Sequence, residues 1–237
     1  MNERAPARVF AVVPAAGIGR RMGSEMPKQY LALAGRTVLE QTLLRIAGHV
    51  AVAQVAIAIS PDDDRFAALA PRLPAACRVV TGGAERCHSV LAGLDAFAAV
   101  AGDTDWALVH DAARPCVRGA DIDRMLEDLA GHAVGGILAV PVRDTLKRCD
   151  GDGNIAATVD RSNLWHALTP QMFRFGTLRR ALRDALDAGL VVTDEAQAIE
   201  HGGLVPRVVA GHADNIKITH PADLALAEQI LAAQAHD

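Results

Sequence analysis

Short runs of apolar residues alternate along the chain with longer segments in which apolar side chains recur every three or four positions. The short runs are typical of buried strands, and the wider spacing is typical of amphipathic helices. We expect strands at Val9–Val13, Val55–Ile59, Arg78–Val80, Trp106–Val109, Gly136–Val140 and Val205–Val209. We expect helices at Thr37–Ala47, Glu85–Val100, Asp121–Ala130, Phe175–Ala188 and Asp194–His201, and a last helix from Pro221. This alternation predicts an α/β fold, with a Rossmann-like, mostly parallel sheet and helices on both faces.

The alternation breaks between Val142 and Asp160, where two polar, strand-like stretches flank the sequence DGDGN at 150–154. Asp and Gly in this order are typical of the tight turn of a β-hairpin. Two strands alone are marginally stable in water, so we expect the hairpin to pack on a second subunit, with a solvated surface excursion as the alternative. No repeat or low-complexity linker divides the chain. We predict a single domain over 1–237, with a dimerisation arm at about 142–165.

Composition narrows the class of protein. The net charge is −4 with mixed signs, and aromatic residues make up 3% of the chain, so both the basic stripe and the stacking surfaces of a nucleic-acid binder are missing. No apolar run reaches membrane-spanning length, and the first run is too short for a signal peptide. The four cysteines form no metal-binding pattern, which favours reduced thiols in a cytoplasmic protein. We expect neither a nucleic-acid nor a membrane partner.

The first predicted strand ends in a glycine-containing loop, PAAGIGRRM at 14–22. Gly17 and Gly19 let the backbone approach a ligand, and ligands of parallel α/β sheets bind beyond the carboxyl ends of the strands. A dinucleotide loop would have a third glycine, which is missing here, and no Walker Lys-Ser/Thr pair is present. Arg21 and Lys28 instead place cations where a polyphosphate would lie. The loop predicts a triphosphate site, with a plain glycine turn and solvated arginines as the alternative.

A second glycine loop, GGAERCHS at 82–89, also follows a predicted strand. Arg86 and Ser89 lie in the first turns of the next helix, where free N–H groups attract anions. A capped helix without a ligand is the alternative for this loop.

A third loop, VHDAARP at 109–115, follows a buried strand. Asp111 is well placed to hold Mg²⁺, which prefers one or two carboxylates together with phosphate oxygens. Arg114 could pair with Asp111 or reach a substrate, and a structural salt bridge is the alternative. We expect His110 to make a structural hydrogen bond rather than to act as a base.

Two further positions of interest lie near the C-terminus. Thr193 or Asp194 would cap the helix that follows, which alone explains these residues. Lys217 alternates with Ile216 and Ile218 in a predicted strand, so it faces away from them and could serve to protect an edge strand.

These motifs together resemble those of the 2-C-methyl-D-erythritol 4-phosphate cytidylyltransferase family. The matching stretches, in family order and over almost the whole chain, are PAAGIGRRM, PKQY, GGAERCHSV, VHDAARP, PVRDTLKR, DRSNLWHALTPQMF, TDEA and DNIKIT. The first stretch is shared with many nucleotidyltransferases, whereas the full set is highly specific. Cys87 and His88 occupy variable positions of the family pattern, and we attach no role to them.

The resemblance implies CTP as a co-substrate, Mg²⁺ as a cofactor, and a set of site residues. The residues implied to bind CTP are Pro14, Ala15, Ala16, Gly17, Gly19, Gly83, Ala84, Arg86 and Ser89. The residues implied to bind the acceptor, a sugar-alcohol phosphate, are Asp111, Arg114, Thr145, Thr169 and Thr193, with Asp111 also at the metal. The catalytic residues implied are Arg21, Lys28, Arg161 and Lys217. The hairpin, near Thr145 and Arg161, is implied to reach into the partner subunit of a homodimer.

The reaction implied by the resemblance transfers CMP from CTP to 2-C-methyl-D-erythritol 4-phosphate and releases pyrophosphate. An oxygen of the acceptor phosphate, already anionic at neutral pH, would attack the α-phosphorus in line, so no general base is needed. Arg21, Lys28 and Mg²⁺ would offset the charge of the CTP phosphates, and Arg161 and Lys217 would hold the incoming phosphate.

Three alternatives stay open at this point. Another cytidylyltransferase of the same superfamily would use a different alditol phosphate, such as ribitol 5-phosphate, but the residues around Thr145, Thr169 and Thr193 match the methylerythritol family. A dinucleotide-dependent oxidoreductase would need the third glycine. A non-catalytic nucleotide-binding regulator would need neither a metal carboxylate nor a second anion site.

Overall fold

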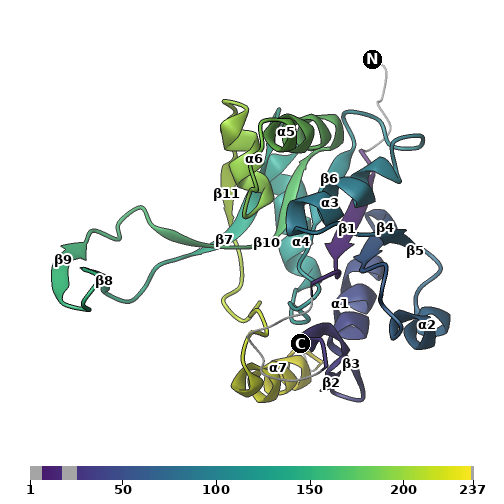
Figure 1. Ribbon diagram of the computed structural model, residues 1–237, viewed down its shortest axis with the longest axis horizontal. Coiled ribbons are helices and arrows are strands. Elements are labelled where there is room, and N and C mark those ends of the chain that lie inside the picture. The colour runs from purple at the N-terminus through teal and green to yellow at the C-terminus, as the bar shows by residue number, and fades with distance from the viewer. Residues whose placement is uncertain (1–6, 18–25, 236–237) are drawn as a thin grey trace.

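The computed structural model describes residues 7–17 and 26–235. Its centre is a seven-stranded sheet with the strand order β11-β7-β10-β6-β1-β4-β5 (Figure 1). Neighbouring strands are parallel except where β10 pairs with β6 and β7. The mostly parallel α/β fold that the sequence predicts is therefore confirmed.

The strands of the central sheet are β1 (Val9–Pro14), β4 (Val52–Ile59), β5 (Cys77–Thr81), β6 (Trp106–Val109), β7 (Gly135–Pro141), β10 (Trp165–Arg174) and β11 (Arg207–Ala210). Two small sheets pair β2 (Ala32–Leu33) with β3 (Arg36–Thr37), and β8 (Leu146–Cys149) with β9 (Ile155–Val159). The α-helices are α1 (Val38–Ala47), α2 (Phe66–Leu69), α3 (Arg86–Asp95), α4 (Gly119–Leu129), α5 (Phe175–Asp187), α6 (Glu195–His201) and α7 (Pro221–Gln234). Two 3-10 helices are η2 (Lys28–Tyr30) and η3 (Ala70–Arg72). None of the helices in the described residues is long and apolar enough to cross a membrane.

Helices cover both faces of the sheet because the central strands are apolar on both sides. On β1, Val9, Ala11 and Val13 point to one face, where they pack with residues of α1 and α4. Phe10 and Val12 alternate with them and pack on the other face with residues of α3, α5 and α6. All five side chains are buried, so β1 is a near-continuous apolar run, as expected of a central parallel strand.

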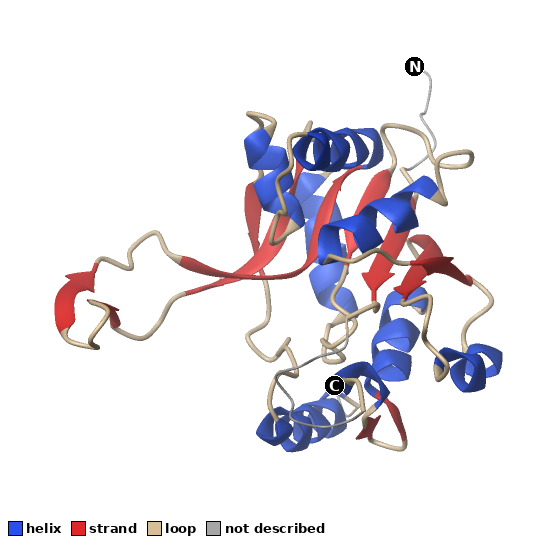
Figure 2. Cartoon of the chain, in the orientation of Figure 1, coloured by secondary structure: helices blue, strands red, loops and turns tan. Residues whose placement is uncertain are grey.

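The predicted hairpin is present as β8 and β9, which project from the body of the molecule (Figure 2). The strands β7 and β10 lead into and out of it, and Pro141 pairs with Trp165 at its base. At its tip, the Asp150 carboxylate accepts hydrogen bonds from the backbone N–H groups of Asp152 and Asn154, at 3.0 and 2.9 Å. The turn residues singled out in the sequence therefore form the turn of the hairpin.

The short elements β2, β3, α2, η2 and η3 are not predicted, and two larger features also differ from the sequence-based expectation. No strand is predicted over β10, which contains a proline, Pro170, that cannot donate a ladder hydrogen bond. A register shift between Ala167 and Gln171 accommodates the proline in the pairing with β7. The predicted strand around Lys217 is wrong, since this residue lies in an extended segment outside the sheets.

Candidate active site

A pocket of about 260 Å³ lies beyond the carboxyl ends of β1, β5 and β6. Its walls are the loops that follow these strands, which is where parallel α/β sheets bind ligands. The residues that line it are Pro14, Ala15, Ala16, Gly17, Lys28, Gln29, Gly83, Ala84, Glu85, Arg86, Ser89, Asp111, Ala112, Ala113 and Lys217. Every described residue that is predicted to bind CTP is among them. Gly19 and Arg21 lie outside the described residues.

A buried glutamine holds the first loop in place. Gln29 is 4% exposed, and its Nε2 donates to the backbone oxygens of Ala15 and Gly17 at 2.9 and 3.1 Å. These two hydrogen bonds fix the path of the backbone along the pocket wall. The neighbouring Lys28 lines the pocket, and its Nζ donates to the backbone oxygen of Ile218 at 3.1 Å. Gln29 belongs to the PKQY motif, but no pattern in the sequence singles it out from the residues around it.

The first and second loops pack together without room for another methyl group. A Cβ built on Gly82 would lie 2.8 Å from both the Ala16 Cβ and the Ser89 Oγ, which is closer than Cβ atoms approach in proteins. Ser89 is buried, and its Oγ accepts a hydrogen bond from the Gly83 N–H at 3.1 Å. Glycine is therefore required at Gly82, and Ser89 shapes the second loop as well as lining the pocket.

Asp111 stands at the centre of a group of cations. Its Oδ2 lies 2.8 Å from Lys217 Nζ and 3.4 Å from Arg114 Nε, and its Oδ1 lies 3.3 Å from Arg86 Nε. Burial alone would raise the pKa of Asp111, but Arg86, Lys217 and Arg114 outweigh it and hold this pKa well below its usual range. Asp111 is therefore ionised at neutral pH. Its pairing with Arg114, expected as one alternative, is one contact of a larger group.

A second carboxylate lies behind Arg86. The Nη1 and Nη2 atoms of Arg86 lie 2.6 and 3.1 Å from Oε1 and Oε2 of Glu195, which is the two-point geometry of a strong guanidinium–carboxylate pair. Burial alone would lower the pKa of Arg86, but Glu195 and Asp111 raise it, so this guanidinium keeps its charge. Glu195 is the first residue of α6, and the predicted cap of this helix, Asp194, accepts a hydrogen bond from the backbone N–H of Gln197.

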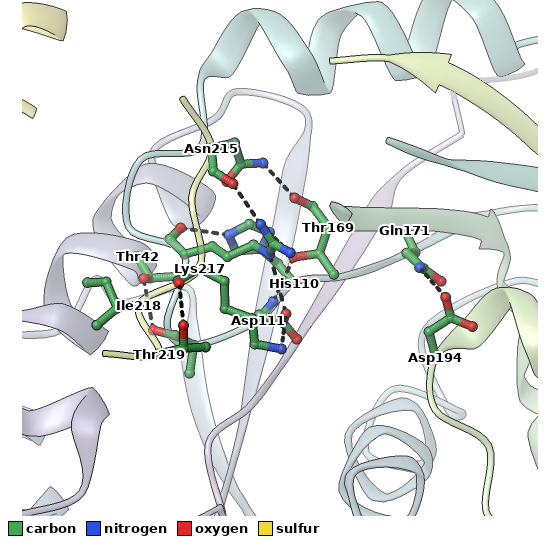
Figure 3. A network of polar contacts seen from close by, with 12 residues as sticks. Thr42, His110, Asp111, Thr169, Gln171, Asp194, Asn215, Lys217, Ile218 and Thr219 are labelled. Atoms are coloured by element: carbon green, nitrogen blue, oxygen red, sulfur yellow. Dashed lines mark hydrogen bonds and ion pairs between the residues drawn. The ribbon is translucent and has the colours of Figure 1, made fainter. Parts of the chain in front are cut away.

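A buried histidine ties the end of β6 to β10 (Figure 3). His110 Nε2 faces the backbone oxygen of Arg114 at 2.9 Å, so this nitrogen carries the proton, and Nδ1 accepts from the Thr169 hydroxyl at 3.0 Å. The Thr169 Oγ1 in turn accepts from the Asp111 backbone N–H at 3.1 Å. Burial lowers the pKa of His110 to about 4, so the ring is neutral at pH 7. These contacts confirm the structural role expected for His110.

Asn215 completes this network. It is fully buried, and its Nδ2 donates to the backbone oxygen of Thr169 at 2.7 Å. Its own backbone oxygen accepts from Arg114 Nη1 at 2.7 Å. Asn215 and Glu195 belong to the DNIKIT and TDEA motifs, but their partners come from distant parts of the chain, so their roles are visible only in the fold.

Three predicted acceptor contacts in the body of the molecule, Arg114, Thr169 and Thr193, lie outside the pocket lining. Thr169 is 5% exposed, and its hydroxyl is engaged in the histidine network. Thr193 is exposed, and its backbone N–H and hydroxyl both donate to Gln197 Oε1, at 2.7 and 3.2 Å. In this structure both threonines support local structure next to the site.

Two other predicted residues, Thr145 and Arg161, belong to the arm that projects from the body (Figure 1). Both are exposed, and Arg161 Nη1 donates to the backbone oxygen of Arg143. The pocket of the same chain holds Lys28 and Lys217 but not Arg161. The described part of a single chain therefore does not bring the predicted catalytic residues together.

Asp111 is also predicted to lie at a Mg²⁺ ion, which prefers one or two carboxylates together with phosphate oxygens. In this structure both oxygens of Asp111 are engaged by cations. The described residues contain no group of three or more His, Cys, Asp or Glu that could hold a metal by protein ligands alone. The metal role of Asp111 stays a prediction.

Comparison with known sequences gives a consistent result. Residues 9–233 match the family model of IspD, 2-C-methyl-D-erythritol 4-phosphate cytidylyltransferase. The enzyme of that name from Shewanella oneidensis is 53% identical over 94% of this chain and 88% of its own length. The one from Cronobacter sakazakii is 55% identical over 93% of this chain and 92% of its own length.

Solved structures agree with this match. A crystal structure of a 4-diphosphocytidyl-2C-methyl-D-erythritol synthase superposes with a TM-score of 0.82 at 39% identity, over 95% of this chain and 99% of its own. The Francisella tularensis 2-C-methyl-D-erythritol 4-phosphate cytidylyltransferase superposes with a TM-score of 0.80 at 34% identity, over 94% of this chain and 100% of its own. The chain therefore belongs to the 2-C-methyl-D-erythritol 4-phosphate cytidylyltransferase family.

Proposed function

We propose that this chain transfers CMP from CTP to 2-C-methyl-D-erythritol 4-phosphate, giving 4-diphosphocytidyl-2-C-methyl-D-erythritol and pyrophosphate. Membership of the family supports both the reaction and the acceptor. The structural observation that carries the proposal is the pocket between two glycine loops, which is lined by the cations Lys28, Arg86 and Lys217, the last two of them paired with one carboxylate, Asp111. Such a pocket favours a polyphosphate and a second anion together.

The chemistry requires little proton transfer. An oxygen of the acceptor phosphate attacks the α-phosphorus of CTP, and the bond to the bridging oxygen of the pyrophosphate breaks. The attacking oxygen is already anionic, which agrees with the neutral and enclosed state of His110. The main obstacle is repulsion, because two unit charges 4 Å apart interact by about 4 kcal/mol at an effective dielectric constant near 20. Cations that are fixed before the reaction lower this barrier.

We assign Lys28 to the phosphates of CTP, together with Arg21 in the part of the chain outside the described residues. We assign Lys217 to the phosphate of the acceptor, in line behind the α-phosphorus. Lys217 lies 2.8 Å from Asp111, so the incoming phosphate competes with this carboxylate for the ammonium group. Mg²⁺ would be held by the phosphates of CTP and would offset part of their charge, with Asp111 as the carboxylate beside it.

We also propose that two copies of the chain form a homodimer through the arm. The arm exposes apolar side chains that a monomer would leave in water, with Ile155 65% exposed and Trp165 42% exposed at its base. It also carries Thr145 and Arg161, which the same chain's pocket lacks. In a two-fold dimer, the arm of one copy would bring these residues to the pocket of the other.

A cytoplasmic location fits the state of the cysteines. All four are free thiols, and Cys149 is exposed on the arm. Exposed free thiols persist in reducing compartments and tend to be oxidised outside them. We therefore propose that the enzyme works in the cytoplasm.

The experiment that tests the function is pyrophosphate release from CTP with a panel of alditol phosphates. We expect release with 2-C-methyl-D-erythritol 4-phosphate and a much smaller rate with ribitol 5-phosphate. Release with ribitol 5-phosphate but not with methylerythritol phosphate would overturn the acceptor. Replacement of CTP by ATP, GTP or UTP in the same assay tests the nucleotide.

A further inference from the structure

Glu195 is a buried carboxylate that the chemistry described above does not use. It is 1% exposed and does not line the pocket. Its two oxygens face the terminal nitrogens of Arg86 at 2.6 and 3.1 Å, while Arg86 itself is part of the pocket wall. Burial of a carboxylate is costly unless it is paired, and Arg86 offsets this cost for Glu195. We expect the same pair to fix the position of Arg86.

Arg86 divides its nitrogens between two carboxylates. Because Nη1 and Nη2 are held by Glu195, Nε is the nitrogen that faces Asp111, at 3.3 Å from its Oδ1. A guanidinium is planar and rigid, so the pair with Glu195 also fixes the direction in which Nε points. The two oxygens of Asp111 therefore have different partners. Arg86 contacts Oδ1, and Lys217 contacts Oδ2.

Hydrogen bonds from the central sheet fix the two residues on either side of Glu195. Gln171 of β10 is 1% exposed, and its Nε2 donates to Asp194 Oδ2 while its Oε1 accepts from the Ala196 backbone N–H, both at 3.0 Å. These two hydrogen bonds lie on either side of Glu195 and fix the start of α6. The carboxylate therefore has little freedom to follow Arg86 if the guanidinium moves.

We propose that Glu195 is a positioning residue, which holds Arg86 so that Asp111 presents one fixed orientation to the acceptor. The inference rests on the proposed function. Without the charge of Glu195, the terminal nitrogens of Arg86 are released toward Asp111 or toward the bound phosphates, and Asp111 turns with them. The loss falls on the acceptor and on turnover more than on CTP, because CTP has further contacts along the two glycine loops.

A double-mutant cycle on the full-length protein tests this role. Glu195→Gln keeps the shape of the side chain and removes its charge. By analogy with residues that orient metal ligands, we expect kcat/KM for methylerythritol phosphate to fall about 10- to 100-fold, while KM for CTP changes less than about 3-fold. In an Arg86→Ala background, Glu195→Gln should have almost no further effect. Glu200→Gln, at an exposed position near the other end of α6, is the matched control and should leave activity unchanged.

The cycle separates positioning from a general structural role. Equal losses from Glu195→Gln with and without Arg86 would overturn the proposal, and so would a loss of CTP affinity as large as the loss for the acceptor. If thermal melting shows that Glu195→Gln does not fold, Glu195→Asp replaces it in the same cycle, and the same loss is expected because a carboxylate withdrawn by one methylene no longer makes the two-point contact with Arg86. A wild-type protein without pyrophosphate release would contradict the proposed function, whereas an active wild type with an undisturbed Glu195→Gln would contradict the positioning role.

Discussion

At the scale of single residues, Lys217 and Asp111 form an ion pair in the absence of a bound phosphate. Their 2.8 Å contact keeps the lysine ordered and directed into the pocket. Once the acceptor phosphate has replaced Asp111 as its partner, an ammonium already directed into the pocket needs little further reorganisation as charge develops, which is the main source of electrostatic catalysis. The ion pair thus prepares Lys217 for the acceptor phosphate rather than removing it from the site.

Replacement of Lys217 tests this assignment. We expect Lys217→Ala to lower kcat by about 100-fold, the usual loss when one fixed donor to a developing charge is removed, and to raise KM for the acceptor. Steady-state pyrophosphate release measures both quantities. Turnover near that of the wild type would contradict the role of Lys217.

Gln29 offers a second test at this scale. Gln29→Ala removes the two hydrogen bonds that Gln29 donates to the backbone oxygens of Ala15 and Gly17 in the first loop, and we expect CTP affinity to fall about 10-fold, or ~1.4 kcal/mol. Calorimetric titration with CTP measures the change. Gln41→Ala is the matched control, because Gln41 donates in the same way to Leu33 and Ala34 outside the pocket lining. Equal effects of the two substitutions on CTP binding would contradict the prediction.

His110 makes stability depend on pH. Burial lowers its pKa from 6.5 to about 4 in the folded protein, so between these values the unfolded chain binds the additional proton. The free energy of unfolding is therefore not reduced by His110 above pH 6.5, where the ring is neutral in both states. It falls as the pH is lowered from 6.5 toward 4, by about 3 kcal/mol in total. Urea unfolding at pH 7.5 and pH 4.5 should show a larger loss for the wild type than for His110→Gln. Equal losses in the two proteins would contradict this role of His110.

At the scale of elements, β10 supports the site from behind. It places Thr169 against the backbone of Asp111 and Gln171 against the start of α6. The sequence alone does not indicate this strand, because Pro170 and the polar residues beside it break the apolar pattern that marks a buried strand. Strands with continuous apolar runs, such as β1 and β4, were predictable for the opposite reason.

In the candidate site, too, features set by nearby residues could be predicted from the sequence, and contacts between distant residues could not. The glycine loops and Asp111 follow predictable strands, so their common position at one edge of the sheet could be predicted from the sequence. The pairing of Arg86 with Glu195 could not, because the two residues are 109 positions apart and each is ordinary in its local context. Contacts that depend on the packing of α6 against the sheet appear only with the fold.

Helix α3 packs so closely on β1 that a methyl group matters. A Cβ added to Gly93 would overlap with the Val12 side chain, so we expect Gly93→Ala to lower the free energy of unfolding by about 1 to 3 kcal/mol. Gly131→Ala is the control, because nothing lies within 4 Å of a Cβ there and its effect should stay within about 0.5 kcal/mol. Urea denaturation measures both. A neutral Gly93→Ala would show that α3 can move away from the sheet.

At the scale of the whole molecule, the proposed dimer predicts that two inactive variants restore each other. Arg161→Ala lacks the arm residue, and Lys217→Ala lacks the pocket residue. In a mixed dimer, the intact pocket of one copy receives the intact arm of the other, so mixing equal amounts under exchange conditions should restore about a quarter of wild-type activity. Size-exclusion chromatography with light scattering establishes the dimer itself. No recovery in freely exchanging dimers would place Arg161 in the pocket of its own chain or outside the site.

The path of β10 also limits the positions at which insertions and deletions can be tolerated in such a chain. This strand leaves the arm at Trp165 and reaches Thr169 and Gln171 without a loop between them. The irregular pairing between Ala167 and Gln171 already accommodates Pro170, so we expect one further residue in this interval to displace Thr169 and Gln171 from their contacts with the site. The hairpin tip at 150–154 is a turn, and no described side chain of the site depends on its length. When proteins of this architecture are aligned, insertions and deletions should therefore gather at the tip and be absent between Trp165 and Gln171.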